Sequence, residues 1–152
     1  MIKSIQNIEN GTVIDHITPG KAIKCMQLMN IKENKTFFIA MNVISTKMGL
    51  KDFIKIEDYF PSSEELEKIS VISPNATIST IKQGKVVEKK QVKTPEFIES
   101  YFKCINPKCV TNQEKEIKTK FKIKSTDPLI LKCLYCGKQM TDEEITEVNK
   151  QQ

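Results

Sequence analysis

Cys104-Ile-Asn-Pro-Lys-Cys109 and, 23 residues later, Cys133-Leu-Tyr-Cys136 are the stretch of sequence that decides the fold of the last third of the chain. Two close cysteine pairs at this separation have the layout of a tetrahedral site in which four thiolates hold one zinc ion. The turn residues in and after the pairs allow each pair to lie on one tight loop. Four thiolates leave no coordination position for water or substrate, so the sequence predicts one structural Zn²⁺ ion per chain. The predicted ligands are Cys104, Cys109, Cys133 and Cys136.

Two other interpretations of the cysteines are open. Four unrelated buried cysteines would not require the paired spacing or the turn residues, and an iron–sulfur cluster would require a spacing that the chain does not have. A bound metal would also supply folding free energy to a module of about 55 residues, which is small for a stable apolar core of its own. The fifth cysteine, Cys25, stands among apolar residues and is interpreted as a small buried side chain.

The chain of 152 residues is long enough for one domain or two small ones. Lys93-Thr94-Pro95 marks a hinge, so we expect one domain over residues 1–95 and a metal-binding domain over residues 96–152. The first segment carries 14 lysines and 10 acidic residues, and the second carries 10 lysines and 9 acidic residues, so their net charges are +4 and +1. All 24 basic residues are lysines. The excess positive charge therefore lies in the first segment, where it favours an anionic ligand.

No apolar run approaches the roughly 20 residues that span a bilayer, and residues 1–6 lack the apolar core of a signal peptide. We therefore expect a cytoplasmic protein without a membrane segment, in a compartment where cysteines stay reduced and bind metal.

Hydrophobic spacing in the first domain predicts alternating strands and helices. Short runs rich in β-branched residues predict strands, and Ser62-Ser-Glu-Glu65 has the pattern of a capping box at the start of a helix. The order strand, helix, strand, strand, helix, strand, strand is that of a ferredoxin-like domain with one added strand. The fold class is therefore α+β: a ferredoxin-like antiparallel sheet with two helices, followed by a small zinc-bound β domain. The predicted strands cover residues 12–17, 37–44, 51–57, 77–81 and 86–92, and the helices cover residues 20–28 and 62–72.

Charged side chains on the predicted strands are candidate ligand contacts. Lys51 and Lys55 are four residues apart on one strand and therefore project from the same face, as convergent phosphate-binding cations would. Asp15 and His16 are adjacent on a strand, which predicts that they point to opposite faces and do not form a catalytic dyad. The plainer alternatives are a solvated lysine face, a surface aspartate and a half-buried histidine.

Several segments together resemble the regulatory chain of aspartate carbamoyltransferase. They are the run Gly11-Thr-Val-Ile-Asp-His-Ile17, the run Met48-Gly-Leu-Lys-Asp-Phe-Ile-Lys-Ile-Glu57, the run Pro74-Asn-Ala-Thr-Ile78 and the two cysteine pairs. The resemblance covers nearly the whole chain in order. It implies a non-catalytic subunit whose first domain binds ATP or CTP and dimerises, and whose zinc domain docks on the catalytic chain.

The resemblance also implies an assembly and a set of contacts. Three regulatory dimers would join two catalytic trimers in a dodecamer of six catalytic and six regulatory chains. CTP would inhibit, ATP would activate, and UTP would assist CTP in controlling the first committed step of pyrimidine biosynthesis. Carried across by motif, the nucleotide contacts are Ile8, Val13, Asp15, His16, Lys51, Lys55, Ile81, Val86 and Lys89.

The chain departs from the family pattern at three positions. Ser79 stands where asparagine is frequent, Gly84 where tyrosine is frequent, and Gln6 where an acidic residue is frequent. Each departure changes a polar or stacking contact of the implied nucleotide pocket, so it bears on nucleotide preference and coupling.

Two other functions compete with the one that the resemblance implies. A zinc ribbon that binds nucleic acid would use the basic strand of Lys118, Lys120, Lys122 and Lys124, but the near-neutral charge of this domain, its few aromatic residues and the absence of arginine count against it. An enzyme acting on a nucleotide would need a nucleophile with its base, or carboxylates for magnesium, and neither pattern is present.

Overall fold

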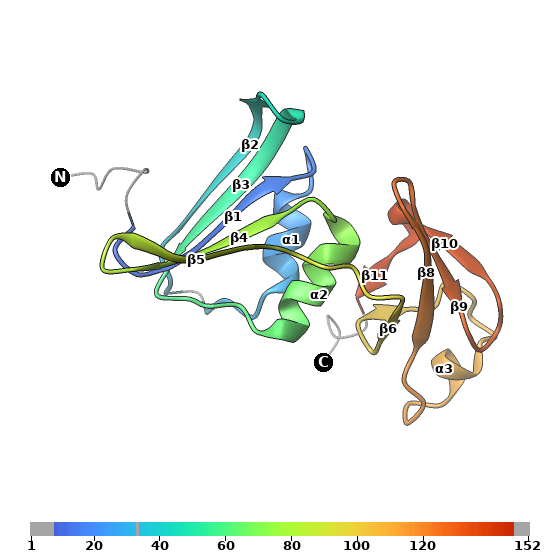
Figure 1. Ribbon diagram of the computed structural model, residues 1–152. Coiled ribbons are helices and arrows are strands. Elements are labelled where there is room, and N and C mark those ends of the chain that lie inside the picture. Colours follow the sequence, from blue (N-terminus) through green and yellow to red (C-terminus); the bar gives the residue numbers. More distant parts are fainter. Residues whose placement is uncertain (1–7, 33, 148–152) are drawn as a thin grey trace. The chain divides into compact units, whose positions relative to one another are not determined.

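The computed structural model describes residues 8–32 and 34–147. Gln6 therefore lies outside the described residues. The chain divides into two compact units, Met1–Thr94 and Pro95–Gln152, each with its own sheet (Figure 1). Within the described part of the chain, every helix is too short or too polar to cross a membrane.

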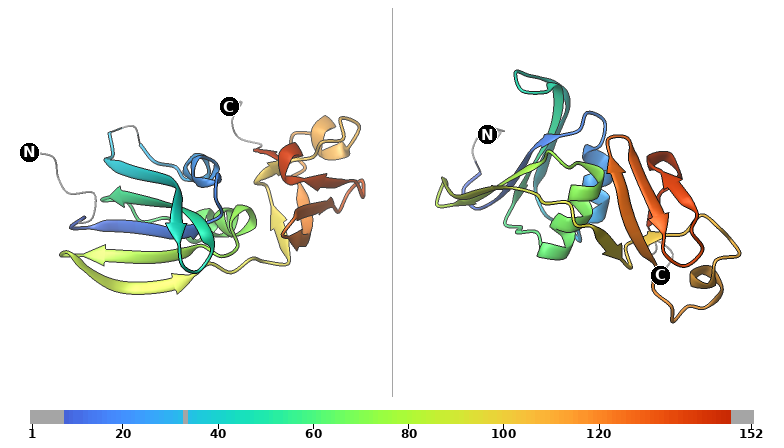
Figure 2. Two further views of the ribbon diagram at one scale, coloured as in Figure 1. Left: turned by 90° about the horizontal axis from the view of Figure 1, so that it is seen from above. Right: turned by 45° about the vertical axis from the view of Figure 1, so that its right-hand side comes forward.

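The first unit is a five-stranded antiparallel sheet with two helices. The strands are β1 (Gly11–Ile17), β2 (Phe37–Ser45), β3 (Gly49–Glu57), β4 (Thr77–Lys82) and β5 (Lys85–Gln91), and the helices are α1 (Ala22–Leu28) and α2 (Ser63–Ile72). The strand order β2-β3-β1-β4-β5 is the ferredoxin-like order with β5 added at one edge. Both helices cover the same face of the sheet, which leaves the other face open (Figure 2). The predicted fold class is confirmed.

The core of the first unit lies between this sheet and its helices. Ile14, Ile54 and Ile56 alternate with half-buried residues along β1 and β3, and they are fully buried, as are Ile69 and Val71 of α2. Alternation along a strand sends successive side chains to opposite faces. The buried set therefore identifies the helix-covered face, and the half-buried residues between them identify the open face.

Helix α2 begins where the capping box predicts. The Ser62 hydroxyl accepts a hydrogen bond from the Glu65 N–H, and the Glu65 carboxylate accepts one from the Ser62 N–H. Helix α1 is shorter than the predicted range and begins at Ala22, whose N–H is bound by the buried carboxylate of Asp52 at 3.0 Å. A local capping signal thus fixed one helix start, whereas the other depends on a side chain 30 residues away.

The second unit is a small β domain. Its elements are β6 (Phe97–Glu99), β7 (Phe102–Lys103), α3 (Val110–Gln113), β8 (Lys120–Thr126), β9 (Leu129–Cys133), β10 (Gln139–Thr141), a 3₁₀ turn (Asp142–Glu144) and β11 (Thr146–Glu147). Strands β10, β9, β8 and β6 form one sheet, and β11 pairs with β7. The hairpin of β8 and β9 connects the first cysteine pair to the second. Phe102, Phe121, Leu131 and Met140 are nearly fully buried and form the core next to the cysteines.

Candidate metal centre and ligand-binding face

The four predicted cysteine ligands come together in the second unit. Their sulfur atoms all lie within 4.8 Å of one another. The Sγ atoms of Cys104 and Cys136 are 3.6 Å apart, and those of Cys109 and Cys133 are 3.8 Å apart. Four sulfurs at about 2.3 Å from zinc would form a tetrahedron with edges of about 3.8 Å. A disulfide would need about 2.05 Å, so these are thiols arranged to hold one ion, and their soft donor set suits zinc.

Hydrogen bonds surround the sulfurs. The Thr111 hydroxyl donates to Cys109 Sγ at 3.2 Å. Burial raises the pKa values of Cys104 and Cys133, and neighbouring thiols raise them further. Burial also acts on Cys136, but hydrogen bonds from the Lys138 N–H and other donors outweigh it and lower its pKa to about 7. Cys136 therefore loses its proton more readily than Cys104 and Cys133, and binding of a metal ion requires the ligand thiols to be deprotonated.

A row of side chains crosses the open face of the first unit. Across the antiparallel ladders, Phe38 of β2 pairs with Lys55 of β3, Lys55 with Val13 of β1, Val13 with Ser79 of β4, and Ser79 with Lys89 of β5. Directly paired residues project from the same face. The register therefore brings Val13, Lys55 and Lys89, which were predicted from different segments, onto one surface.

An ion pair lies beside this row. Lys51 Nζ is 2.9 Å from Asp15 Oδ1, and both side chains are partly exposed. Burial alone would raise the pKa of the Asp15 carboxyl, but hydrogen bonds from Lys51 and from the His16 N–H hold it below its usual value. Asp15 is therefore a stable anion that positions the Lys51 ammonium on the open face.

His16 does not point away from Asp15 as strict alternation predicts. The β1–β3 register shifts between Ile14 and Ile17, and His16 has a positive φ of 56°. Its Nδ1 lies 2.9 Å from the hydroxyl of Thr77, the residue that pairs with Asp15 across β4. A bulge of this kind adds one residue to the strand and turns its side chain. The bulge thus brings Asp15, His16 and Lys51 to the same end of the open face.

The apolar candidates lie toward the β4–β5 turn. Ile81 pairs with Gly11 on one side and with Val86 on the other, and Ile8 and Ile81 are buried whereas Val86 is exposed. Gly11 is required there, because a Cβ atom would lie 2.0 Å from the carbonyl oxygen of Ile56.

Two positions at which the chain departs from the family pattern lie in the same region. Ser79 is in the middle of the row between Val13 and Lys89, and Gly84 is in the turn with a φ of 75°. They contribute only a hydroxyl group and backbone groups to this face.

A cavity of about 320 Å³ beside this turn was not predicted from the sequence. It is lined by Glu9, Asn10, Glu57, Asp58 and Gln83. Glu57 pairs with Gly11 and is two residues from Lys55, so the cavity adjoins the row of paired residues. Glu57 ends the quoted run Met48–Glu57, whereas Glu9 and Asp58 lie outside the quoted motifs, so the sequence does not show that these acids meet.

Comparisons with known proteins match both units. A family model described as the aspartate carbamoyltransferase regulatory chain, allosteric domain, matches residues 3–93, and one described as its metal binding domain matches residues 96–146. The regulatory chain of Methanocaldococcus jannaschii is 46% identical over 138 residues, which cover 91% of this chain and 92% of that protein. Those of Thermococcus sibiricus and Pyrococcus horikoshii are 43% and 44% identical, and the matches cover 94% and 93% of this chain and 95% and 94% of those proteins.

These matches confirm the resemblance and agree with the metal centre described above. They do not favour the zinc-ribbon alternative. The family consists of non-catalytic regulatory chains, and its members partner a catalytic chain. The chain therefore belongs to the family of aspartate carbamoyltransferase regulatory chains.

Proposed function

We propose that the open face of the first unit is an effector site for ATP and CTP, with UTP assisting CTP, and that the second unit docks on the catalytic chain. The observation that carries the effector site is the row of paired residues. Strands β3 and β5 are three strand spacings apart, or about 14 Å. Lys55 and Lys89 therefore flank Val13 and Ser79 on the open face, a span that suits a triphosphate.

The charges on this unit also suggest how a nucleotide lies. Lys51, Lys55 and Lys89 provide the positive part of the face, whereas Glu9, Glu57 and Asp58 make the adjoining cavity acidic. Phosphates are disfavoured near the carboxylates, which accept hydrogen bonds from amino groups. We infer that the triphosphate lies over the lysines and that the base lies toward the cavity and the apolar residues Ile81 and Val86.

Strand β2 supports the proposed homodimer. This edge strand, FFIAMNVIS, has no charged residue, and its side chains Phe37, Met41 and Ile44 are exposed, Ile44 by 88%. The opposite edge strand, β5, carries three lysines and a glutamate. Charged edges resist pairing with another strand, and uncharged apolar edges favour it. We propose that two copies pair through β2 and that three such dimers join two catalytic trimers in a dodecamer.

Regulation then follows from linkage. A nucleotide shifts the equilibrium between two quaternary states only by its different affinity for the two states. ATP and CTP share the triphosphate, so the lysines hold both, and contacts to the base must make them act differently. Control of the first committed step of pyrimidine biosynthesis would be exerted in this way, with residues 1–95 binding nucleotide and dimerising and residues 96–152 docking.

Two lysines on β5 test the effector site. Lys89 pairs with Ser79 on the open face, whereas its neighbour Lys90 pairs with Ile78 and projects from the opposite face. We expect Lys89→Ala to lower the affinity for ATP and the affinity for CTP alike, each by roughly 10-fold, because one charge-assisted contact is lost. Titration calorimetry with each nucleotide checks this, and Lys90→Ala is the matched control. Equal affinities for the two variants would contradict the proposed face.

A further inference from the structure

Asn112 holds the first cysteine loop through its side-chain amide. This residue lies in α3, directly after the Cys104–Cys109 loop. Its Nδ2 donates to the carbonyl oxygen of Cys104 at 2.8 Å and to that of Asn106 at 2.7 Å. One NH₂ group has two hydrogens, so both are used within this loop.

Asn106 is the residue through which this clamp reaches the sulfurs. Its backbone N–H is hydrogen-bonded to Cys104, and its side chain to Cys136, which belongs to the other cysteine pair. Its Oδ1 accepts the Lys108 N–H at 3.0 Å, and its carbonyl oxygen accepts the Cys109 N–H at 2.9 Å. When the Asn106 carbonyl is held in place, two donors of the same residue are held as well. They are its backbone N–H, which faces Cys104 on the first loop, and its side-chain amide, which faces Cys136 on the second loop.

The second loop is closed differently. Gly137 N–H donates to the Cys133 carbonyl and Cys133 N–H donates to the Lys138 carbonyl, each at 2.9 Å. These are backbone bonds of a tight turn with two residues between its cysteines. The first loop has four residues between its cysteines, and Pro107 supplies no N–H for such a bond. A side chain from the following helix takes this role in the first loop.

We propose that Asn112 is a positioning residue of the metal centre and that, acting through Asn106, it slows release of the metal from the Cys104 side. Partners of this kind orient ligands, and their loss typically costs about 10- to 100-fold in metal affinity. The proposal rests on the four cysteines being the metal ligands.

The test compares Asn112→Ala with Gln113→Ala, an exposed neighbour on the same helix. The full-length proteins are loaded with zinc, and the rate of transfer to a chromogenic chelator is measured. We expect release about 10- to 100-fold faster for Asn112→Ala, no more than about twofold faster for Gln113→Ala, and an intermediate rate for Asn112→Gln, which keeps the amide. If Asn112→Ala cannot be loaded with zinc, the zinc-release rates of Asn112→Gln and Gln113→Ala are compared instead. Equal release rates for these two variants would overturn the proposal.

Hydrogen exchange separates positioning from general destabilisation. Loss of the clamp should speed exchange at the amides of residues 105–109 and leave those of residues 133–138 unchanged. Uniformly faster exchange over the whole unit, or equal zinc release for Asn112→Ala and Gln113→Ala, would overturn the inference. A wild-type chain that binds no zinc would instead refute the ligand assignment on which the inference rests.

Discussion

Glu65 shows how one side chain joins separate elements of the first unit. Its carboxylate accepts hydrogen bonds from the Ser62 N–H at the start of α2, from the Asn30 N–H after α1, and from the hydroxyl of Tyr59. Burial alone would raise the pKa of Glu65, but these bonds outweigh it and hold the pKa below 4.5. Burial, together with the hydrogen bond to Glu65, raises the pKa of Tyr59.

This pKa shift predicts a pH-dependent effect of Glu65→Gln. A carboxyl with a depressed pKa in the folded state stabilises the fold above its unfolded pKa, and this stability is lost as the pH falls through the folded pKa. We expect Glu65→Gln to lower the unfolding free energy by about 1 kcal/mol at pH 7 and by progressively less below pH 4.5. Urea unfolding from pH 7 to pH 3.5 measures this.

Glu67→Gln is the control, because Glu67 is exposed on the same helix. Any metal release at low pH affects all three proteins, so the difference between them isolates Glu65. A constant difference between the two variants at all pH values would show that Glu65 does not act through its charge.

Asp52 is a residue whose structural role the sequence did not predict. Its carboxylate is fully buried and accepts the N–H groups of Ala22 and Asn42, at 3.0 and 2.8 Å. The sequence indicates Lys51 and Lys55 by spacing, but it does not show that the residue between them holds the start of α1 and the irregular part of β2. Such contacts between distant segments carry no local signal.

At the scale of elements, local signals predicted most of the first unit. The capping box gave the start of α2, and β-branched runs gave all five strands to within two residues at each end. The bulge that turns His16 was missed, because it depends on pairing with β3. The short elements β6, β7, β10, β11 and α3 were also missed, because segments of two to four residues are stabilised by tertiary contacts around the cysteines.

A charge placed on strand β2 should weaken the proposed dimer. Ile44→Lys places a charge on the proposed dimer edge and should raise the dissociation constant of the regulatory dimer at least about 10-fold, or ~1.4 kcal/mol. Sedimentation equilibrium of the full-length chain measures it. Val87→Lys, at an exposed apolar position on the opposite edge strand, should leave the dimer intact. Dissociation by Val87→Lys alone would assign the dimer to β5.

At the scale of the whole molecule, the cysteine spacing and the run of motifs were enough to predict the family. Spacing predicts the metal centre well, because four ligands on two loops form a self-contained unit. The proposed effector face is harder to predict, because its residues come from four strands and the acidic cavity depends on strand register. Net charge gave a partial indication, since the excess lysines lie in residues 1–95.

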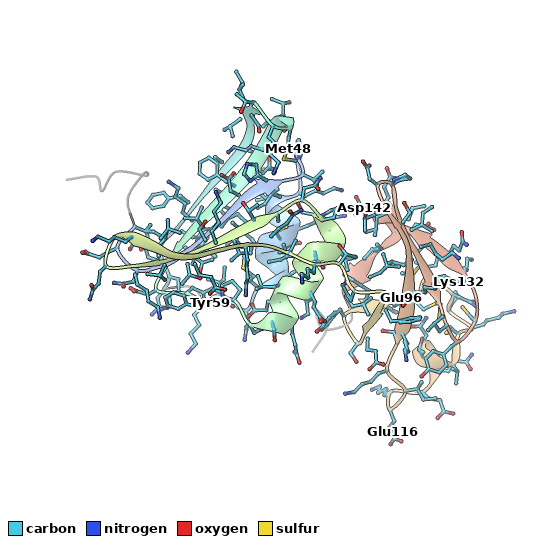
Figure 3. The ribbon with its side chains drawn as sticks, in the orientation of Figure 1. Met48, Tyr59, Glu96, Glu116, Lys132 and Asp142 are labelled. Atoms are coloured by element: carbon cyan, nitrogen blue, oxygen red, sulfur yellow. The ribbon has the colours of Figure 1, made fainter. Side chains whose placement is uncertain are left out.

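The nucleic-acid alternative also fails to gain support at this scale. Lys120 Nζ on β8 lies 3.4 Å from Glu99 Oε1 and 5.6 Å from the centre of the Phe97 ring. One of the four lysines that would form the basic strand is therefore engaged within the unit. Lys132 of β9 pairs with Lys122 of β8. Figure 3 shows the position of Lys132 on the second unit. The comparisons instead match this unit to the metal-binding domain of a regulatory chain.

The chain is a regulatory chain, and we propose that its metal-stabilised unit docks on the catalytic chain. The most direct test mixes the zinc-loaded chain with its cognate catalytic chain and measures mass by light scattering, with and without chelator. We predict a particle of about 300 kDa, as expected for six chains of each kind, that is lost when the metal is removed. No complex in the presence of zinc, or a complex that persists after complete metal removal, would contradict it.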